Sequence, residues 1–260
     1  MIDLSDRVVI VTGASRGIGK GLAIGLAQLG ATVVCAARTA VEAPDGLPGT
    51  IHATVDEITE NGGNALAVQC DIGEERDIDH LATTTVERLG RIDVLVNNAM
   101  APTRTSFSDS TVEEWDESMR VNVRSLYLLT QAVVPAMTKA GGGSIVNISS
   151  GGAEHASQPF MPPGYLFYSV AKAALERFTS AVAPELAPLG ITMNALRPGA
   201  VKTELATREL GDDYDWSHWN TPESVVPSVA FLASQIGTDF TGRILDVSGF
   251  GTSWGVEGDG

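Results

Sequence analysis

Short, continuously apolar segments alternate with longer amphipathic segments along this chain of 260 residues. After the first apolar run, residues Ile18 to Leu29 place apolar side chains three or four positions apart, which is the spacing of one helix face. The apolar runs predict strands at residues 8–11, 32–36, 65–69, 94–96, 144–148, 192–196 and 243–247. The amphipathic segments predict helices at residues 18–29, 51–61, 74–89, 111–138 and 168–186.

Strands without polar alternation indicate a parallel sheet that helices cover on both faces. We therefore predict an α/β fold with a doubly wound, seven-stranded parallel sheet. The alternation continues through nearly all of residues 1–260 without a linker, which favours a single domain. One irregular stretch at about 199–221 is rich in polar, acidic and aromatic residues, and we expect a substrate lid there.

Composition supports a large core and limits the partners. Hydrophobic residues make up 43% of the chain, so disorder is not expected. The chain has 17 Lys and Arg against 32 Asp and Glu, a formal charge of −15. Such an acidic protein repels phosphate backbones and anionic lipid surfaces, which argues against nucleic-acid and membrane partners. Residues 1–50 hold equal numbers of acids and bases, so the whole excess follows residue 50.

Cysteine usage and hydropathy indicate a protein of the cytoplasm. Cys35 and Cys70 are too few for a disulfide scaffold. No basic-then-apolar leader is evident, and no stretch approaches 18 apolar residues, so we expect no membrane span. The four histidines and two cysteines show no spacing typical of a metal site, and we predict none.

A glycine-rich turn follows the first predicted strand and opens the first predicted helix. It reads Thr12-Gly13-Ala14-Ser15-Arg16-Gly17-Ile18-Gly19. Glycines permit a tight turn and a close approach to a pyrophosphate, and the helix N-terminus adds free N–H groups. The turn therefore predicts a dinucleotide-binding Rossmann fold, and a ligand-free strand–helix connection is the alternative. The predicted cofactor contacts here are Gly13, Ser15, Arg16, Gly17, Ile18 and Gly19.

The end of the second predicted strand favours NADP over NAD. An acidic residue at this position would bind the ribose 2′-hydroxyl of NAD, but the chain has Arg38 and no acid. We expect Arg38 to meet a 2′-phosphate and Arg16 to clamp it, because a planar guanidinium matches phosphate geometry. The alternative is that Arg38 is a solvated loop residue, and NAD is the less favoured cofactor.

Further motifs follow in a fixed order. Asn97-Asn98-Ala99 ends the fourth predicted strand, Asn122 lies in the long helix, and Ser149-Ser150 ends the fifth strand. Tyr168 and Lys172 open the next helix, and Arg197-Pro198-Gly199 follows the sixth strand with Thr203 further on. Over about residues 5–250, this order and spacing resemble the short-chain dehydrogenase/reductase family, in its single-domain branch.

The resemblance implies an oxidoreductase that acts on a carbonyl and alcohol pair. Tyr168 would be the acid/base, although a tyrosine with a pKa of about 10 is a poor proton-transfer group at neutral pH. Lys172 lies four residues later on the same helix face, and we expect its charge to lower the pKa of Tyr168. The family pattern assigns Ser150 to the substrate oxygen and Asn122 to a water relay behind Lys172.

The family pattern also implies the remaining cofactor contacts. It assigns the adenine to Asp71 and Ile72, a ribose to Asn98 beside Ala99, and the nicotinamide side to Tyr168, Lys172, Pro198, Gly199, Val201 and Thr203.

Two of these assignments compete with neighbouring residues. Tyr165 has serine at the i+4 position, so only Tyr168 has the lysine partner. The family's serine is usually the second of such a pair, which favours Ser150 over Ser149.

The chain departs from the family pattern at three places. Met100 stands where the family has glycine, and it would narrow the pocket near the nicotinamide unless it is a tolerated loop substitution. The loop at 151–164 is longer than the common form and is expected to wall the substrate site. His155 in that loop could move protons, although a solvated histidine is favoured. The loop at 38–50 is also long, and we expect it to cover the adenosine end.

The leading hypothesis is an NADP-dependent oxidoreductase that interconverts a ketone or aldehyde and an alcohol by hydride transfer. A 3-oxoacyl thioester reductase, acting on acyl-CoA or acyl-carrier protein, is the alternative. Acyl-carrier proteins are acidic, and Asp212, Asp213 and Asp215 make the expected lid acidic, which disfavours that partner. A non-catalytic nucleotide-binding regulator is a second alternative, disfavoured by the complete catalytic set.

Aromatic residues in the expected lid suggest an apolar or ring-bearing small-molecule substrate, or else ordinary packing. They are Tyr214, Trp216 and Trp219. Finally, the family resemblance implies a homotetramer with the helices at 111–138 and 168–186 at an interface.

Overall fold

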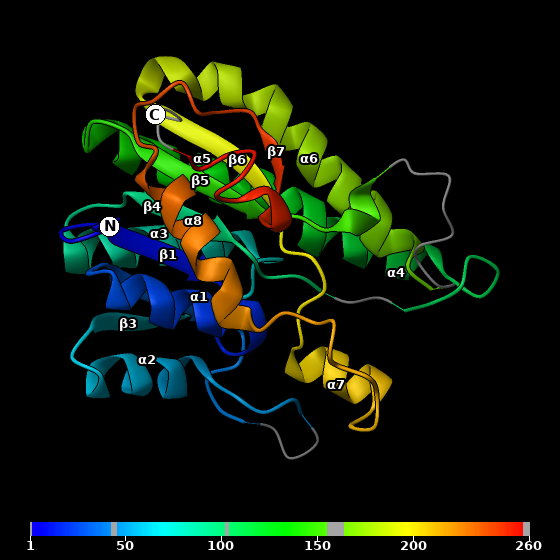
Figure 1. The fold of residues 1–260 in the computed structure, drawn as a ribbon. Coiled ribbons are helices and arrows are strands. Elements are labelled where there is room, and N and C mark those ends of the chain that lie inside the picture. Colours follow the sequence, from blue (N-terminus) through cyan, green and yellow to red (C-terminus); the bar gives the residue numbers. More distant parts are fainter. Residues whose placement is uncertain (1, 43–45, 102–103, 155–163, 257–260) are drawn as a thin grey trace.

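Seven parallel strands form one sheet in the computed structural model, which describes residues 2–42, 46–101, 104–154 and 164–256 (Figure 1). The strands are β1 (Val8–Thr12), β2 (Thr32–Ala37), β3 (Asn64–Gln69), β4 (Val94–Asn97), β5 (Gly143–Ile148), β6 (Ile191–Arg197) and β7 (Ile244–Asp246). Their order is β3-β2-β1-β4-β5-β6-β7, and every pairing is parallel. The predicted doubly wound, seven-stranded parallel sheet is therefore confirmed.

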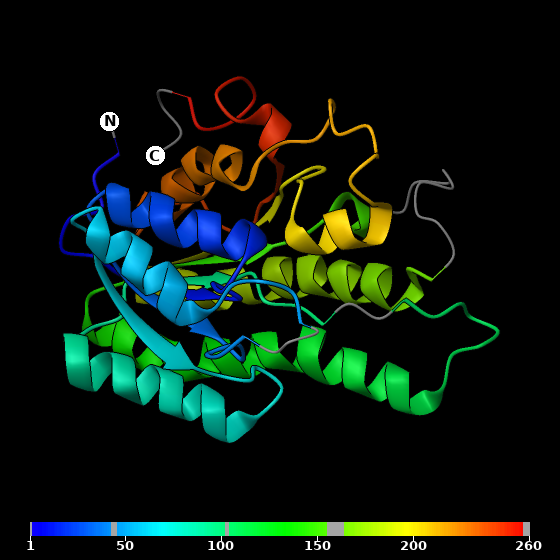
Figure 2. The same ribbon diagram turned by 90° about the horizontal axis from the view of Figure 1, so that it is seen from below.

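Helices cover both faces of the sheet (Figure 2). Helices α1, α2 and α8 lie on one face, and α3, α5 and α6 lie on the other. The helices are α1 (Gly17–Gln28), α2 (Ile51–Glu60), α3 (Glu75–Leu89), α4 (Val112–Met119), α5 (Ser125–Lys139), α6 (Leu166–Leu186), α7 (Glu204–Leu210) and α8 (Val226–Ser234).

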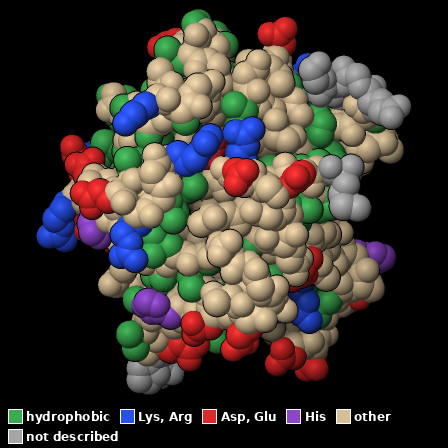
Figure 3. Space-filling view, turned by 90° about the vertical axis from the view of Figure 1, so that its left-hand side faces the viewer, with side chains coloured by type: hydrophobic (Ala, Val, Ile, Leu, Met, Phe, Trp, Pro, Cys, Tyr) green, Lys and Arg blue, Asp and Glu red, His purple; other side chains and the backbone are tan. Residues whose placement is uncertain are grey.

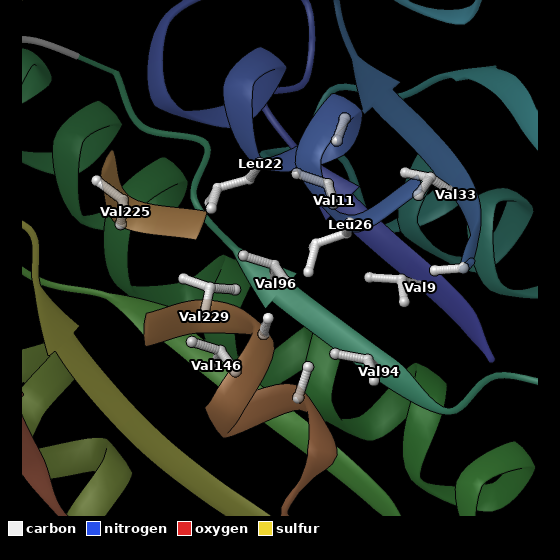
Figure 4. Packing of buried hydrophobic residues seen from close by; sticks show 14 of the residues in the cluster. Val9, Val11, Leu22, Leu26, Val33, Val94, Val96, Val146, Val225 and Val229 are labelled. Carbon is white, nitrogen blue, oxygen red and sulfur yellow. The ribbon is translucent and has the colours of Figure 1, made fainter. Parts of the chain in front are cut away.

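Alternate residues of each central strand serve two hydrophobic cores. Val9 and Val11 of β1 point to the α1 side, where they pack in one cluster with Leu22 and Leu26 (Figure 4). Ile10, between them, belongs to the cluster on the opposite face. Since successive side chains of a strand point to opposite faces, a strand covered on both sides must be apolar throughout. This explains the continuous apolar runs in the sequence.

The single helix expected at 111–138 is interrupted, and that prediction was wrong in this respect. The structure has α4, then a π-helical turn at Arg120–Arg124, then α5. A π-turn adds one residue to a helical turn and is common at functional sites. The apolar spacing survives on both sides of the turn, so the sequence pattern does not reveal it. The interruption lies at Asn122, one of the predicted catalytic residues.

The irregular stretch at 199–221 contains one short helix, α7. Thr203 caps this helix by accepting a hydrogen bond from the Ala206 N–H at 3.2 Å. A β-bridge between Val201 and Asn220 brings the two ends of the stretch together. In Figure 1, α7 lies outside the two helical layers, on the side of the molecule toward which the strands run.

The side opposite α7 carries charges of both signs (Figure 3). Acidic side chains gather along the lower edge of this view, and Lys and Arg are scattered, with two basic side chains next to each other above the centre. Among the described side chains, this side shows no continuous basic surface of the kind that binds a phosphate backbone. No helix within the described residues combines the length and apolarity needed to cross a membrane.

Candidate active site

The site lies where the strand order reverses, at the carboxyl ends of β1 and β4. Parallel α/β sheets bind ligands at such a switch point because the connections leave it on opposite faces. The glycine-rich turn begins there with Gly13 at a φ of +70°. A Cβ on Gly13 would lie 2.8 Å from Asn98 Nδ2, and a Cβ on Gly19 would overlap the Gly13 carbonyl oxygen. Only glycine fits these two positions.

Thr12 ties β1 to β4 below the turn. Its Oγ1 accepts hydrogen bonds from the backbone N–H groups of Asn98 at 3.0 Å and Ala99 at 3.1 Å. Asn98 in turn donates through Nδ2 to the Thr12 carbonyl at 2.9 Å. The amide nitrogen of Asn98 is therefore committed to the β1 end, which leaves its Oδ1 for the predicted ribose contact.

The N-terminus of α1 favours a bound anion. Arg16 is the N-cap and makes no side-chain cap, and the first turn contains no acidic residue. The backbone N–H groups there are uncapped by described side chains and carry the positive end of the helix dipole. The glycine-rich turn and these N–H groups together form a glycine cradle, which fits the pyrophosphate of a dinucleotide.

The two arginines expected at a 2′-phosphate have different surroundings. Arg16 donates to the backbone carbonyls of Leu47, Pro48 and Gly49 at 2.9–3.1 Å, so its guanidinium holds the loop at 46–50 against the glycine turn. Arg38 has a side chain that is 61% exposed, and its one ion pair among the described residues reaches Asp71 at 3.9 Å. The exposed guanidinium of Arg38 is therefore available to a phosphate, whereas the guanidinium of Arg16 is already bonded to backbone carbonyls.

The residues expected at the adenine follow the end of β3. Asp71 accepts a hydrogen bond from the Gly73 N–H at 2.9 Å, and Ile72 is buried.

Ser150 and Tyr168 form a hydrogen-bonded pair at the end of β5 and the start of α6. Ser150 Oγ also accepts from the Gly152 N–H at 3.1 Å. Ser149 is turned away from this pair, since its hydroxyl donates to Glu176 Oε1 at 2.7 Å. The two serines are therefore separated by geometry, and Ser150 is the one next to the tyrosine.

Lys172 lies one turn further along α6, and its side chain is buried. Its Nζ donates to the Ile148 carbonyl at 2.6 Å and lies 5.7 Å from the centroid of the Tyr168 ring. Burial lowers the pKa of Lys172 to about 8, and the charge of Glu176 opposes that fall. The ammonium therefore loses its proton at a pH of about 8, well below the usual range of a lysine.

The pKa of Tyr168 is raised above its ordinary value, whereas we expected Lys172 to lower it. Burial of the phenol is the main cause, while the hydrogen bond from Ser150 and the charge of Arg104 each oppose it. The prediction was wrong for this structure because burial of the phenol outweighs the charges around it, and Lys172 is not among the groups that shift this pKa. Arg104 lies on the other side, with its guanidinium 5.7 Å from the Tyr168 ring centroid.

Asn122 lies in the π-helical turn, and its side chain holds the loop after β4. Oδ1 accepts from the Ala101 N–H at 2.8 Å, and Nδ2 donates to the Ala101 carbonyl at 3.0 Å and to Ser118 Oγ at 3.2 Å. Both polar atoms of the amide are therefore used within the protein, next to Met100. The predicted water relay would have to use its backbone.

The residues expected around the nicotinamide form the start of the irregular stretch. Gly199 has a φ of +74°, a conformation that suits glycine, and it follows Pro198 at the end of β6. Val201 is buried, and Thr203 approaches the glycine turn, since a Cβ on Gly17 would lie 3.2 Å from its Cγ2.

Arg104 joins the loop after β4 to α7, and it was not among the residues predicted from the sequence. Its guanidinium stacks 3.8 Å from the centroid of the Tyr165 ring and pairs with Glu209 of α7 at 3.3 Å. These two charges are 105 positions apart, so no local pattern connects them.

The aromatic residues of the irregular stretch pack on one another. Trp216 lies 5.0 Å from Tyr214 and 5.1 Å from Trp219, ring centroid to ring centroid. The Trp216 Nε1 is buried without a partner among the described residues, and Lys202 Nζ lies 4.9 Å from the Trp216 ring centroid.

Some predicted features lie outside the described residues. These include His155 and most of the loop at 151–164, together with residues 43–45 of the loop at 38–50. Within the described part of the chain, no three His, Cys, Asp or Glu side chains are grouped as a metal site would require. Cys35 and Cys70 are both free and buried.

The sheet, the glycine cradle and the Ser150, Tyr168 and Lys172 group define a dinucleotide-dependent oxidoreductase. Residues 7–213 match the family model described as short chain dehydrogenase, and the chain belongs to the short-chain dehydrogenase/reductase family. It is accordingly an NAD(P)-dependent dehydrogenase or reductase.

Relatives within the family differ in substrate and nucleotide. The chain is 36% identical to a 3-oxoacyl-[acyl-carrier-protein] reductase of Synechocystis sp., over 96% of this chain and 98% of that protein. A solved 7α-hydroxysteroid dehydrogenase, complexed with NADH and 7-oxo glycochenodeoxycholic acid, has 32% identity and a TM-score of 0.82, over 96% of this chain and 95% of that one. A solved chain from Beutenbergia cavernae with bound NADP has 32% identity and a TM-score of 0.81, over 95% and 96%.

Proposed function

We propose that this protein is an NADP-dependent oxidoreductase that interconverts a ketone or aldehyde and an alcohol, with Tyr168 as the acid/base. The observation that carries the proposal is the Ser150–Tyr168 hydrogen bond beside the buried Lys172, next to the glycine cradle. The bound nucleotide would supply or accept the hydride. A non-catalytic regulator would have no need for this arrangement.

In the reducing direction, Tyr168 gives its phenolic proton to the substrate oxygen while that oxygen gains electron density. Ser150 is placed to hydrogen-bond the same oxygen and to hold the Tyr168 hydroxyl. The positive charge of Arg104 favours the tyrosinate that proton transfer leaves behind. The Lys172 ammonium, whose Nζ lies 5.7 Å from the Tyr168 ring centroid, would add to this by electrostatic attraction during the reaction. In the oxidising direction, the same tyrosinate takes the proton from the alcohol.

NADP is the proposed nucleotide because Arg38 stands at the end of β2 with no acidic residue beside it in sequence. Its exposed guanidinium suits a 2′-phosphate. The remaining contacts are those of the family pattern. Gly13, Ser15 and Gly17–Gly19 would hold the pyrophosphate, Asp71 and Ile72 the adenine, Asn98 and Ala99 a ribose, and Pro198, Gly199, Val201 and Thr203 the nicotinamide.

We further propose that residues 199–221 form a substrate lid and that the substrate carries an apolar or ring-bearing group. The mutual packing of the Tyr214, Trp216 and Trp219 rings supports this. The Trp216 N–H, which is buried without a partner among the described residues, could donate to a substrate. Arg104 and Glu209 would hold α7 near Tyr168.

A panel of free ketones and aldehydes, with oxidation of NADPH followed by absorbance, tests the proposal. We expect turnover of at least one ring-bearing carbonyl, and loss of that turnover in Tyr168→Phe without loss of NADPH binding. Tyr165→Phe is the matched control, because it removes the neighbouring phenol that lacks a lysine partner. Retained turnover in Tyr168→Phe would contradict the assigned role.

Reduction of 3-oxoacyl thioesters is the second candidate. The 36% identity to a 3-oxoacyl-[acyl-carrier-protein] reductase over nearly the whole of both chains favours it. The charge of −15 and the acidic residues at 212, 213 and 215 oppose an acidic carrier-protein partner.

We also propose a homotetramer assembled through α4–α5 and α6. Apolar or aromatic side chains are exposed on these helices at Val112, Trp115, Tyr127 and Val170. Light scattering on a size-exclusion column would measure the assembly, and a monomeric mass would contradict it.

A further inference from the structure

A carboxylate lies directly behind the proposed catalytic group. Glu176 is four residues after Lys172 on α6, so the two side chains occupy the same helix face. Its Oε1 accepts from Ser149 Oγ and from Arg197 Nε, each at 2.7 Å, and its Oε2 accepts from Arg197 Nη2 at 2.9 Å. The side chains of Glu176 and Arg197 are only 13% and 14% exposed. Glu176 is therefore a fixed, largely buried charge.

The same carboxylate joins the three segments that present the catalytic residues. Ser149 directly precedes Ser150 at the end of β5, and Arg197 directly precedes the Pro198–Gly199 turn at the end of β6. Glu176 itself lies on the helix that carries Tyr168 and Lys172. A bidentate arginine–carboxylate pair fixes distance and orientation together.

We propose that Glu176, held by Arg197 and Ser149, is a positioning residue that keeps Lys172 charged and aligned for proton transfer by Tyr168. This inference rests on the proposed function for its kinetic consequence, and on the geometry alone for the ionisation of Lys172. Nothing in the family pattern described above assigns a role to residue 176 or to its pair with residue 197.

The charges around Lys172 explain why this carboxylate matters. On α6, Lys172 faces Tyr168 on one side and Glu176 on the other, and the nearest group of β5 is the uncharged Ile148 carbonyl. Arg197 of β6 lies behind Glu176. Without the Glu176 charge, the buried ammonium would lose its attractive neighbour and keep a repulsive one, which favours the neutral amine.

Other charges lie further from Lys172 and provide controls. Glu154 and Asp246 also pair with Arg197, and both are more exposed than Glu176. Arg104 lies across the Tyr168 ring. Glu154 contacts the same arginine as Glu176 but does not lie on α6. A variant of Glu154 therefore shows what loss of a carboxylate at Arg197 does without removing the carboxylate next to Lys172.

The test is the variant Glu176→Gln, which preserves the shape and most hydrogen bonds but removes the charge. We expect the apparent pKa of Lys172 to fall by about one unit, equivalent to a tenfold change in its protonation constant. Competitive acetylation followed by mass spectrometry measures this without substrate. The chain has four lysines, so Lys20, Lys139 and Lys202 serve as internal references. The matched control Glu154→Gln should leave Lys172 unchanged.

Kinetics then test the consequence for the reaction. In Glu176→Gln, the alkaline limb of the kcat/KM profile for carbonyl reduction should move to lower pH by a similar amount. In Arg197→Gln, the alkaline limb should move to higher pH, because Glu176 without its arginine partner attracts the charged form of Lys172 more strongly. A simple loss of packing would not produce shifts in opposite directions in the two variants. An unchanged Lys172 titration in Glu176→Gln, or an equal shift in Glu154→Gln, would overturn the inference. If the wild-type protein turned over no carbonyl, the proposed function would be refuted, but the acetylation result would still test the effect of Glu176 on Lys172.

Discussion

At the scale of single residues, the site is organised by how charges are buried. Lys172 is a buried ammonium with one carbonyl acceptor, and burial lowers its pKa to about 8. Tyr168 is a phenol whose pKa burial raises, with Ser150 and Arg104 opposing the rise. Near neutral pH, Tyr168 is therefore protonated and Lys172 is charged, and these are the states that carbonyl reduction needs.

The first prediction concerns the pH dependence of carbonyl reduction. Below the lowered pKa Lys172 is charged, and as pH rises through about 8 it becomes neutral while Tyr168 remains protonated. We therefore expect kcat/KM to fall about tenfold per pH unit above about 8, because the tyrosinate loses a stabilising charge. Steady-state rates in buffers of constant ionic strength measure this. Lys172→Arg should lower the maximum rate and remove this limb, since arginine stays charged. A limb that persists unchanged in that variant would exclude Lys172 as its source.

The second prediction separates the two arginines near the proposed 2′-phosphate. Arg38→Ala should weaken NADPH binding by about tenfold or more and change NADH binding little, because only NADPH carries the extra phosphate. Arg16→Ala should weaken both nucleotides to a similar extent, because Arg16 holds the backbone at Leu47–Gly49. Fluorescence titration of both nucleotides with both variants gives the comparison. Equal losses for the two nucleotides in Arg38→Ala would count against NADP as the cofactor.

At the scale of elements, strands and helices with a regular apolar pattern can be predicted from the sequence, whereas features that depend on contacts between distant residues cannot. The seven strands and the glycine turn follow from apolar runs and from Gly13 and Gly19, where added side chains would clash. The π-turn at Asn122 could not be predicted, because one extra residue leaves the flanking apolar spacing intact. Arg104 pairs with a residue 105 positions away, and no periodic pattern reports such a contact. Glu176 was not predicted either: its i+4 spacing from Lys172 is visible in the sequence, but its contacts with Ser149 and Arg197 are not.

The third prediction concerns α7, which the Arg104–Glu209 pair connects to the loop after β4. If α7 is part of a lid, Arg104→Gln and Glu209→Gln should each raise KM for the carbonyl several-fold. The double variant should raise it by no more than the larger single effect, because both changes remove one interaction. Arg104→Gln should also lower kcat, since of the two paired residues only Arg104 affects the ionisation of Tyr168. A double-mutant cycle on KM and kcat tests this, and strictly additive effects on KM would show that the ion pair does not hold α7.

At the scale of the whole molecule, the charge is uneven along the chain, and this affects a nucleotide and an acidic macromolecule differently. The first fifth of the chain is balanced and contains the glycine turn with Arg16 and Arg38, whereas the excess of acids follows residue 50. A phosphate-bearing nucleotide can therefore dock on the first βαβ unit of an otherwise acidic protein. The same excess opposes an acidic macromolecule that must approach the stretch at 199–221, which contains Asp212, Asp213 and Asp215.

The last prediction uses this repulsion to separate the two candidate functions. The same 3-oxoacyl group is offered on an acidic acyl-carrier protein and on a small neutral thioester, with NADPH oxidation as the signal. If free carbonyls are the substrates, kcat/KM with the carrier protein should be lower than with the neutral thioester and should rise several-fold between low and physiological salt, because ions screen like-charge repulsion. The rate with the neutral thioester should respond little to salt. Replacing Asp212, Asp213 and Asp215 by asparagine should reduce the salt effect for the carrier-protein substrate and leave the neutral thioester unaffected. A carrier-protein rate that exceeds the neutral thioester and falls as salt is added would instead show attraction, and would establish the carrier-protein reductase as the better description of this enzyme.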